Sequence, residues 1–177
     1  IMPMEFNGTK MYLYCASGGV VGVSAEDGRI LWETDEWKIR IANVPSPLVV
    51  GEDRVFFCGG YGAGSMMLRL KEEEGRIVPE TLFRLEPKQF GSVQHTPILY
   101  EGHIYGVRPD GQFVCLDLEG NEKWTSTSAH KFGGGSYMMI GSLIYVLNDT
   151  GLVGRVEAAP DEFRLVDQTQ VLEGHES

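Results

Sequence analysis

The chain has 177 residues, of which 42% are hydrophobic and 23 are glycine, and its formal net charge is −10 at pH 7. This acidic balance argues against a protein that binds nucleic acid or anionic membranes without specificity. The sequence also lacks the roughly 18–20 consecutive apolar residues of a membrane-spanning helix, so we expect no membrane span.

One pattern of short apolar runs and glycine-containing turns occurs four times along the chain. The predicted repeats cover about 2–35, 46–85, 96–126 and 136–168, and 169–177 is predicted to be a linker toward a further blade. Repeats of roughly 40–50 residues with several short strands are typical of β-propeller blades. One small sheet cannot bury two apolar faces unless other sheets stack on it. We therefore predict a single propeller segment over 1–177.

The third repeat shows the strands most clearly. It contains four short predicted strands, which are Pro97–Tyr100, Ile104–Val107, Phe113–Asp117 and Lys123–Thr125. The turns between them each contain a glycine, which takes the positive φ angles that tight hairpins need. We name the four strands of each repeat A to D in chain order. The B-strand runs Lys10–Ala16 and Arg54–Cys58 are apolar enough to predict packing on both faces between neighbouring blades.

These patterns predict an all-β fold, a β-propeller with four four-stranded antiparallel blades. Propellers have about four to eight blades, so a closed four-bladed ring and half of an approximately eight-bladed ring both agree with the repeat count. We favour the half ring, because the tail Val171–Ser177 leads out of the fourth repeat as if toward a fifth. A homodimer or further blades of the same protein would then close the ring.

Two repeats contain a glycine followed four residues later by a tryptophan. These pairs are Gly28 with Trp32 and Gly120 with Trp124. They resemble the tryptophan-docking motif, A-x-D-x-x-T-G-x-x-x-W, of the PQQ-like (quinoprotein alcohol dehydrogenase-like) β-propeller repeat family. A flat indole near the outer strand can cover the adjacent blade, so we predict structural docking roles for all four residues.

The motif is degenerate in this chain. Gly22 and Ser24 stand where the family motif has alanine and aspartate. The second repeat has Pro79 and the fourth has Arg164 near the tryptophan position, so we expect docking to be lost in both.

The resemblance implies two alternative functions. In quinoprotein dehydrogenases, PQQ lies over the ring axis with a calcium ion, a catalytic Asp, a tryptophan floor and often a Cys-Cys pair. This sequence has no Cys-Cys pair, and no set of Asp, Glu and Asn accompanies the loop residue Trp37. We therefore predict a protein that is not an enzyme and has no catalytic, cofactor-binding or metal-binding residues. The alternative is part of a PQQ-dependent dehydrogenase whose cofactor ligands lie largely in missing blades.

The chain resembles the non-enzymatic branch of this family, such as the outer-membrane-assembly lipoprotein scaffolds. That resemblance implies a binding or scaffolding module and an extracytoplasmic location, either periplasmic or secreted.

Other motifs do not indicate a site. Gly60-Tyr-Gly62-Ala-Gly64 is followed by Ser65, so it lacks the sixth-place glycine of a dinucleotide-binding loop. The histidines have no metal-binding spacing. The three cysteines, Cys15, Cys58 and Cys115, have no CxxC spacing, and we expect buried free thiols.

The linkers that join strand D of one repeat to strand A of the next share a distinct pattern. Each places a lysine one or two residues before an isoleucine or phenylalanine. One interpretation is that the apolar residue wedges between blades. The other is a cationic and aromatic patch that binds an acidic protein segment, a glycan or a small anion through loops on the D–A/B–C face. The candidate binding residues are Trp37, Lys38, Arg40, Lys88, Phe90, His95, His130 and Lys131.

Overall fold

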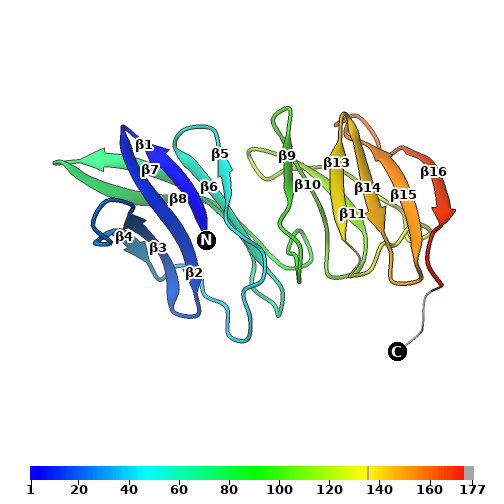
Figure 1. The fold of residues 1–177 in the computed structure, drawn as a ribbon, viewed down its shortest axis with the longest axis horizontal. Coiled ribbons are helices and arrows are strands. Elements are labelled where there is room, and N and C mark those ends of the chain that lie inside the picture. Colours follow the sequence, from blue (N-terminus) through cyan, green and yellow to red (C-terminus); the bar gives the residue numbers. More distant parts are fainter. Residues whose placement is uncertain (135, 174–177) are drawn as a thin grey trace. The chain divides into compact units, whose positions relative to one another are not determined.

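The computed structural model describes residues 1–134 and 136–173. These residues form four separate four-stranded sheets (Figure 1), and consecutive strands are antiparallel neighbours in every sheet. The chain divides into two compact units, Ile1–Thr96 and Pro97–Ser177, each of which holds two blades. The prediction of an all-β chain with four four-stranded antiparallel blades is confirmed. Among the described residues there is no helix of the length and apolarity that crossing a membrane requires.

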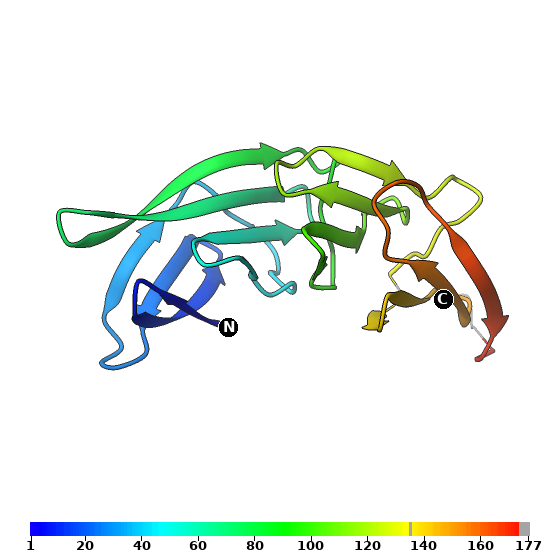
Figure 2. The same cartoon turned by 90° about the horizontal axis from the view of Figure 1, so that it is seen from above.

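The first unit contains blades 1 and 2. Between the two sheets, Met11 and Leu13 pack in one cluster with Val55 and Phe57. The hairpin of the two ten-residue strands projects beyond its neighbours (Figure 2). The strands are β1 (Met2–Phe6), β2 (Thr9–Ala16), β3 (Gly19–Ser24), β4 (Ile30–Thr34), β5 (Leu48–Val50), β6 (Arg54–Gly59), β7 (Gly64–Glu73) and β8 (Arg76–Leu85).

The second unit contains blades 3 and 4. Its core joins Tyr105 and Phe113 of blade 3 to Ile144 and Val156 of blade 4. The strands are β9 (Ile98–Tyr100), β10 (His103–Val107), β11 (Phe113–Asp117), β12 (Glu122–Thr125), β13 (Tyr137–Ile140), β14 (Leu143–Leu147), β15 (Leu152–Glu157) and β16 (Leu165–Gln170).

The two B-strand predictions have different outcomes. In β6 every residue from Val55 to Gly59 is buried, as predicted for a strand covered on both faces. In β2 buried and exposed residues alternate, and Tyr12 and Tyr14 are 47% and 49% exposed. The prediction that Lys10–Ala16 is covered on both faces is wrong, because only one face of blade 1 packs against the other sheet of its unit.

Two further expectations concern local features. The last strand of the fourth blade continues to Gln170, into the predicted linker 169–177, of which 174–177 lie outside the described residues. The prediction of buried free thiols is confirmed for all three cysteines. Burial raises the pKa of Cys15 to about 12 and that of Cys115 to about 11, so both are neutral thiols at physiological pH.

Candidate partner-binding loops

The first D–A linker, residues 35–47, anchors itself on blade 2 through two buried side chains. Trp37 is 3% exposed and Ile39 is also buried. The ring centroids of Trp37 and Phe57 lie 6.2 Å apart. A Cβ atom on Gly59 would lie 2.8 Å from Ile39 Cδ1 and 3.1 Å from Trp37 Cζ2. Glycine at the end of β6 therefore allows the linker to lie directly against the B–C turn of blade 2.

The second D–A linker, residues 86–97, contacts the same turn. Phe90 is fully buried, and the centroid of its ring lies 5.8 Å from the ring centroid of Phe56. A Cβ atom on Gly60 would come within 2.9 Å of Val93 Cα. Two linkers thus flank the turn between β6 and β7, and the Ser46 amide joins them by donating to Thr96 Oγ1 at 2.9 Å.

The structure places the predicted aromatic residues of the first unit in the core. Both rings are buried, and Trp37 packs in the cluster between the two sheets of the unit, as the wedge interpretation expects. His95 is half-buried, and its backbone is held by Ser92, whose hydroxyl donates to the His95 carbonyl at 2.6 Å.

The predicted cations of the first unit are exposed. Lys38, Arg40 and Lys88 all point away from the buried anchors next to them in sequence. Lys38 Nζ pairs with Asp35 at 3.0 Å, and this lysine lowers the pKa of Asp35. The positive charge of Lys38 is therefore partly compensated, whereas neither Arg40 nor Lys88 has an ion pair among the described residues.

Sequence reasoning missed three exposed apolar side chains on these loops. Ile41 and Val44 lie on the first linker, and Tyr61, 54% exposed, lies on the B–C turn that the linker covers. Tyr61 adopts a φ of 55°, which a residue other than glycine, asparagine or aspartate rarely takes. Its signal in the sequence is a single aromatic residue inside the glycine-rich run Gly60-Tyr-Gly62-Ala-Gly64, which partly resembles a dinucleotide-binding loop. We define the first-unit linker face by its exposed residues Lys38, Arg40, Ile41, Val44, Tyr61 and Lys88.

The third D–A linker, in the second unit, repeats the same construction. Phe132 is buried, and a Cβ atom on Gly154 of β15 would lie 3.2 Å from the Phe132 ring. The Phe132 amide donates to the Gly111 carbonyl at 2.7 Å, and Lys131 forms an antiparallel bridge with Gln112. The linker therefore lies against the B–C turn of blade 3 and exposes Lys131.

The charges around Lys131 are mixed. A shallow hollow of about 330 Å³ places Lys131 together with Asp110 and Asp149. Partial burial opposes ionisation of Asp110, but hydrogen bonds from Arg108 and the Gln112 amide outweigh it and hold the pKa of Asp110 below its usual range. The two carboxylates make this part of the surface less cationic than the sequence pattern indicated.

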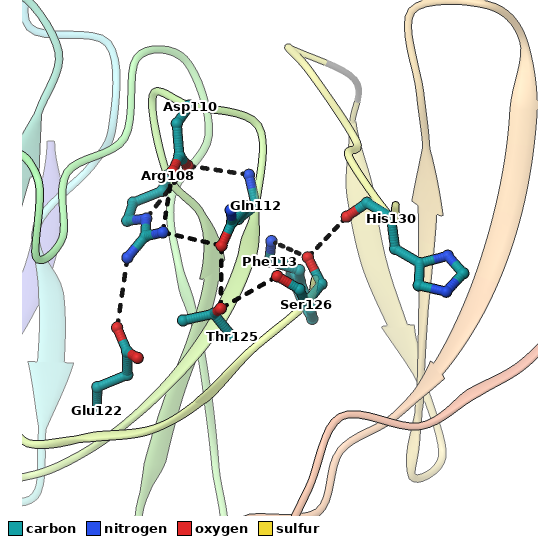
Figure 3. Close-up of polar contacts among 8 residues, drawn as sticks. All are labelled: Arg108, Asp110, Gln112, Phe113, Glu122, Thr125, Ser126 and His130. Carbon is teal, nitrogen blue, oxygen red and sulfur yellow. Dashed lines mark hydrogen bonds and ion pairs between the residues drawn. The ribbon is translucent and has the colours of Figure 1, made fainter. Parts of the chain in front are cut away.

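A polar network contacts the third linker through Ser126 (Figure 3). Arg108 donates to Gln112 Oε1 at 3.0 Å and forms ion pairs with Asp110 and Glu122. The Ser126 hydroxyl, which is fully buried, donates to the His130 carbonyl at 2.7 Å and accepts from the Phe113 amide. The His130 backbone is thereby fixed, and its half-buried ring packs 5.6 Å from that of Phe163.

The four motif residues occupy structural positions. Gly28 and Gly120 lie in the C–D turns with positive φ angles of 76° and 86°. Trp32 and Trp124 are both buried. The Trp124 Nε1–H donates to the carbonyl of Ala159 in blade 4 at 2.7 Å, so this indole docks onto the next blade.

The residues present do not fit a bound quinone and calcium. The loop residue Trp37 lies inside the core against Phe57. Within residues 1–134 and 136–173, no group of three or more His, Cys, Asp or Glu side chains could hold a metal ion.

The repeated sheets, glycine turns and buried indoles define a β-propeller module built from PQQ-like repeats. The family model described as outer membrane protein assembly factor BamB matches residues 2–126. The chain belongs to this family. A search of curated proteins finds no match.

Solved propellers share the fold at low sequence identity. BamB from Moraxella catarrhalis is 17% identical over 96% of this chain, with a TM-score of 0.63. The computationally designed Ika8 protein is 13% identical over 99% of this chain, with a TM-score of 0.61. Saccharomyces cerevisiae Sqt1 is 11% identical over 96% of this chain, with a TM-score of 0.66. In each comparison the match covers 49% of the other chain, so this chain spans about half the length of these propellers.

Proposed function

We propose that the chain is a non-enzymatic binding module that takes a segment of a partner protein on the first-unit linker face. The observation that carries this proposal is the construction of the linkers. Each buries an apolar side chain, Ile39 or Phe90, against blade 2 and so holds a neighbouring cation in solvent. Loops fixed on a rigid frame in this way keep a binding surface ordered before the partner arrives, which lowers the entropy lost on binding.

The composition of the face favours a protein segment over a glycan or a small anion. Exposed Ile41, Val44 and Tyr61 supply apolar and aromatic contact area. Arg40 and Lys88 supply positive charge in an otherwise acidic protein. Partner surfaces of this kind combine an apolar centre with charges that orient the incoming chain. We therefore expect an extended segment that carries both apolar and acidic residues.

Family membership supports an extracytoplasmic setting for this function. The matching model describes an assembly factor of the outer membrane, and the chain covers about half of the solved BamB. We propose that the module acts outside the cytoplasm, as a scaffold rather than as a dehydrogenase.

The test uses a synthetic decapeptide that alternates leucine and glutamate, titrated into the ¹⁵N-labelled chain. We expect amide shifts confined to residues 36–46, 60–63 and 86–95. Reversing two cations, Arg40→Glu with Lys88→Glu, should weaken binding about tenfold or more, a loss of about 1.4 kcal/mol. A matched control reverses two exposed cations elsewhere, Arg76→Glu with Lys123→Glu, and should bind within about twofold of the original chain. Shifts located outside these loops, or equal weakening by both pairs, would contradict the proposal.

A further inference from the structure

Tyr61 combines an exposed aromatic side chain with a strained backbone. Its φ of 55° lies in the left-handed region, and the following residue, Gly62, has a φ of 82°. The backbone alone closes this turn, because the Ala63 amide donates to the Gly60 carbonyl at 3.0 Å. Glycine, asparagine and aspartate adopt the left-handed conformation readily, whereas other side chains are strained in it. A tyrosine therefore disfavours the turn that it occupies.

The equivalent B–C turns of blades 3 and 4 hold themselves in place with polar side chains. In blade 3, Asp110 Oδ1 accepts a hydrogen bond from the Gln112 amide at 3.1 Å. In blade 4, Asn148 Oδ1 accepts one from the Leu152 amide at 2.8 Å. The Tyr61 side chain makes no hydrogen bond with any residue that the structure describes. Strained residues that do not stabilise their surroundings are typical of functional positions.

The other strained positions of the chain carry polar side chains. Among the described residues, three more residues other than glycine have positive φ angles, and all three are exposed to solvent. They are Asn7, Glu74 and Glu101. Tyr61 alone in this group places an aromatic ring in such a turn.

Two linkers hold the base of the Tyr61 turn. A Cβ atom on Gly59 would lie 2.8 Å from Ile39 Cδ1 of the first linker, and one on Gly60 would lie 2.9 Å from Val93 Cα of the second. Tyr61 directly follows these two glycines, so its side chain leaves the surface where both linkers meet the turn. A tyrosine side chain has only two rotatable angles, so a fixed backbone orders most of its contact area before a partner binds.

We propose that Tyr61 selects the partner, by packing its ring on an apolar side chain of the acidic segment. This inference rests on the proposed function, in which Arg40 and Lys88 attract that segment. Tyrosine and arginine are enriched among the residues that dominate protein interfaces. Exposed Ile41 and Val44 extend the apolar surface along the first linker. Charge then brings an acidic segment to the first-unit linker face, and Tyr61 distinguishes an apolar acidic segment from one that is only acidic.

Two synthetic decapeptides test this selection by isothermal titration calorimetry. One alternates leucine and glutamate and the other alternates serine and glutamate, so both carry the same charge. The original chain should bind the leucine peptide about tenfold more tightly than the serine peptide. Tyr61→Gly should weaken binding of the leucine peptide about fivefold or more and change binding of the serine peptide by less than about twofold. Such coupling between a residue and a ligand group indicates that the two are in contact.

Three further variants sharpen the result. Tyr61→Phe keeps the ring without the hydroxyl group and should retain the preference for leucine. Tyr61→Asn suits the φ of 55° without supplying a ring, and it should lose the preference as Tyr61→Gly does. The control Asn7→Gly changes an uncharged residue of similar φ, 48°, in the A–B turn of blade 1, and should leave both affinities unchanged. Circular dichroism melting curves should show no loss of stability for Tyr61→Gly, because glycine relieves the strain.

The outcomes separate this inference from the proposed function. If Tyr61→Gly weakens neither peptide, or weakens both equally, the inference is wrong. The proposed function would still hold in that case, provided that Arg40→Glu with Lys88→Glu weakens both peptides. If the original chain binds neither peptide, or if the double charge reversal leaves binding unchanged, both the proposed function and this inference are wrong.

Discussion

Blades 1 and 3 carry the same tryptophan motif but place its indole differently. Trp32 stands opposite Gly22 in the β3–β4 ladder, and Trp124 stands opposite Cys115 in the β11–β12 ladder. Both ladders shift register immediately after the residue opposite the tryptophan. The backbone framework around the two indoles is therefore alike.

The residue opposite the tryptophan differs, and with it the position of the indole. A Cβ atom on Gly22 would lie 2.2 Å from Trp32 Nε1, so the indole of blade 1 lies directly over the neighbouring strand β3 of the same blade. Its N–H donates to Met11 Sδ at 3.3 Å, within the same blade. In blade 3 the Cys115 side chain occupies the corresponding space. The indole of Trp124 donates to Ala159 and packs edge-on, 5.6 Å from the ring of Phe163 in blade 4.

The comparison teaches that the residue across the ladder distinguishes a motif tryptophan that covers the neighbouring strand of its own blade from one that docks onto the next blade. A glycine opposite the tryptophan leaves room for the ring, whereas any side chain fills that room.

The largest expected effect comes from removing the indole that joins two blades. Trp124→Ala should lower the free energy of unfolding by about 3–5 kcal/mol, because the ring packs against Tyr105, Phe113 and Phe163. Denaturant-induced unfolding measures the loss. The matched variant Trp124→Phe keeps a six-membered aromatic ring but loses the pyrrole part of the indole and the hydrogen bond to Ala159, which together should cost about 1–3 kcal/mol. A loss below about 1 kcal/mol for Trp124→Ala would contradict the docking role.

A smaller loss should follow from filling the space opposite Trp32. Gly22→Ala should destabilise the chain by about 1–3 kcal/mol, because the new methyl group would overlap the indole. Thermal unfolding followed by tryptophan fluorescence reports both the loss and the displaced ring. Gly18→Ala serves as the control and should be nearly neutral, since nothing lies within 4 Å of a Cβ atom there. Equal melting temperatures for Gly22→Ala and Gly18→Ala would contradict this prediction, because they would show that the indole of Trp32 can move aside without loss of stability.

The smallest expected effect concerns the C–D turns next to the two tryptophans. Asp117 accepts hydrogen bonds from the backbone amides of Glu119 and Asn121, and Ser24 accepts the equivalent bonds from Glu26 and Asp27 in blade 1. Partial burial opposes ionisation of Asp117, yet the hydrogen bonds from Asn121 and Glu119 outweigh it and lower its pKa. The carboxylate therefore stabilises the fold at neutral pH by about 1 kcal/mol.

Because the folded-state pKa of Asp117 is lowered, its contribution is complete above the unfolded pKa of about 3.9 and is lost as the pH falls through the folded value. Asp117→Asn should therefore be less stable than the original chain at pH 7, and the difference should shrink as the pH falls below about 4. Ser24→Ala should also lose stability at pH 7, and its loss should shrink as the pH falls, because the Ser24 hydroxyl hydrogen-bonds to Asp27 and lowers the pKa of that carboxyl. Unfolding curves at pH 7 and pH 3 provide the measurement, and a constant difference for Asp117→Asn would contradict the assignment.

Much of the fold could be predicted because its signals are local. Glycines such as Gly102 and Gly111 lie in turns with positive φ angles, and the apolar run at Phe113–Asp117 is the strand that the structure contains. The buried position of Ile39, Phe90 and Phe132 also follows from one interpretation of the linker pattern.

The candidate site could be predicted only in part. The linker lysines were found because a lysine beside a buried anchor repeats in the sequence. Trp37 was expected at a binding surface, but its side chain is buried in the core, where the absence of a side chain at Gly59 leaves room for it. Tyr61 was overlooked because its exposure depends on a turn whose flanks are covered by linkers far away in sequence.

The sequence by itself determined the number of blades, the strand order and the turn positions, because these depend on residue period and on backbone angles that neighbouring residues set. The tertiary structure alone decided which apolar residues are covered. Tyr12 and Val55 lie in similar apolar runs, yet one is half exposed and the other fully buried. The physical reason is that burial depends on the sheet stacked against a strand, and Val55 has such a sheet across from it whereas the outer face of blade 1 has none within its unit.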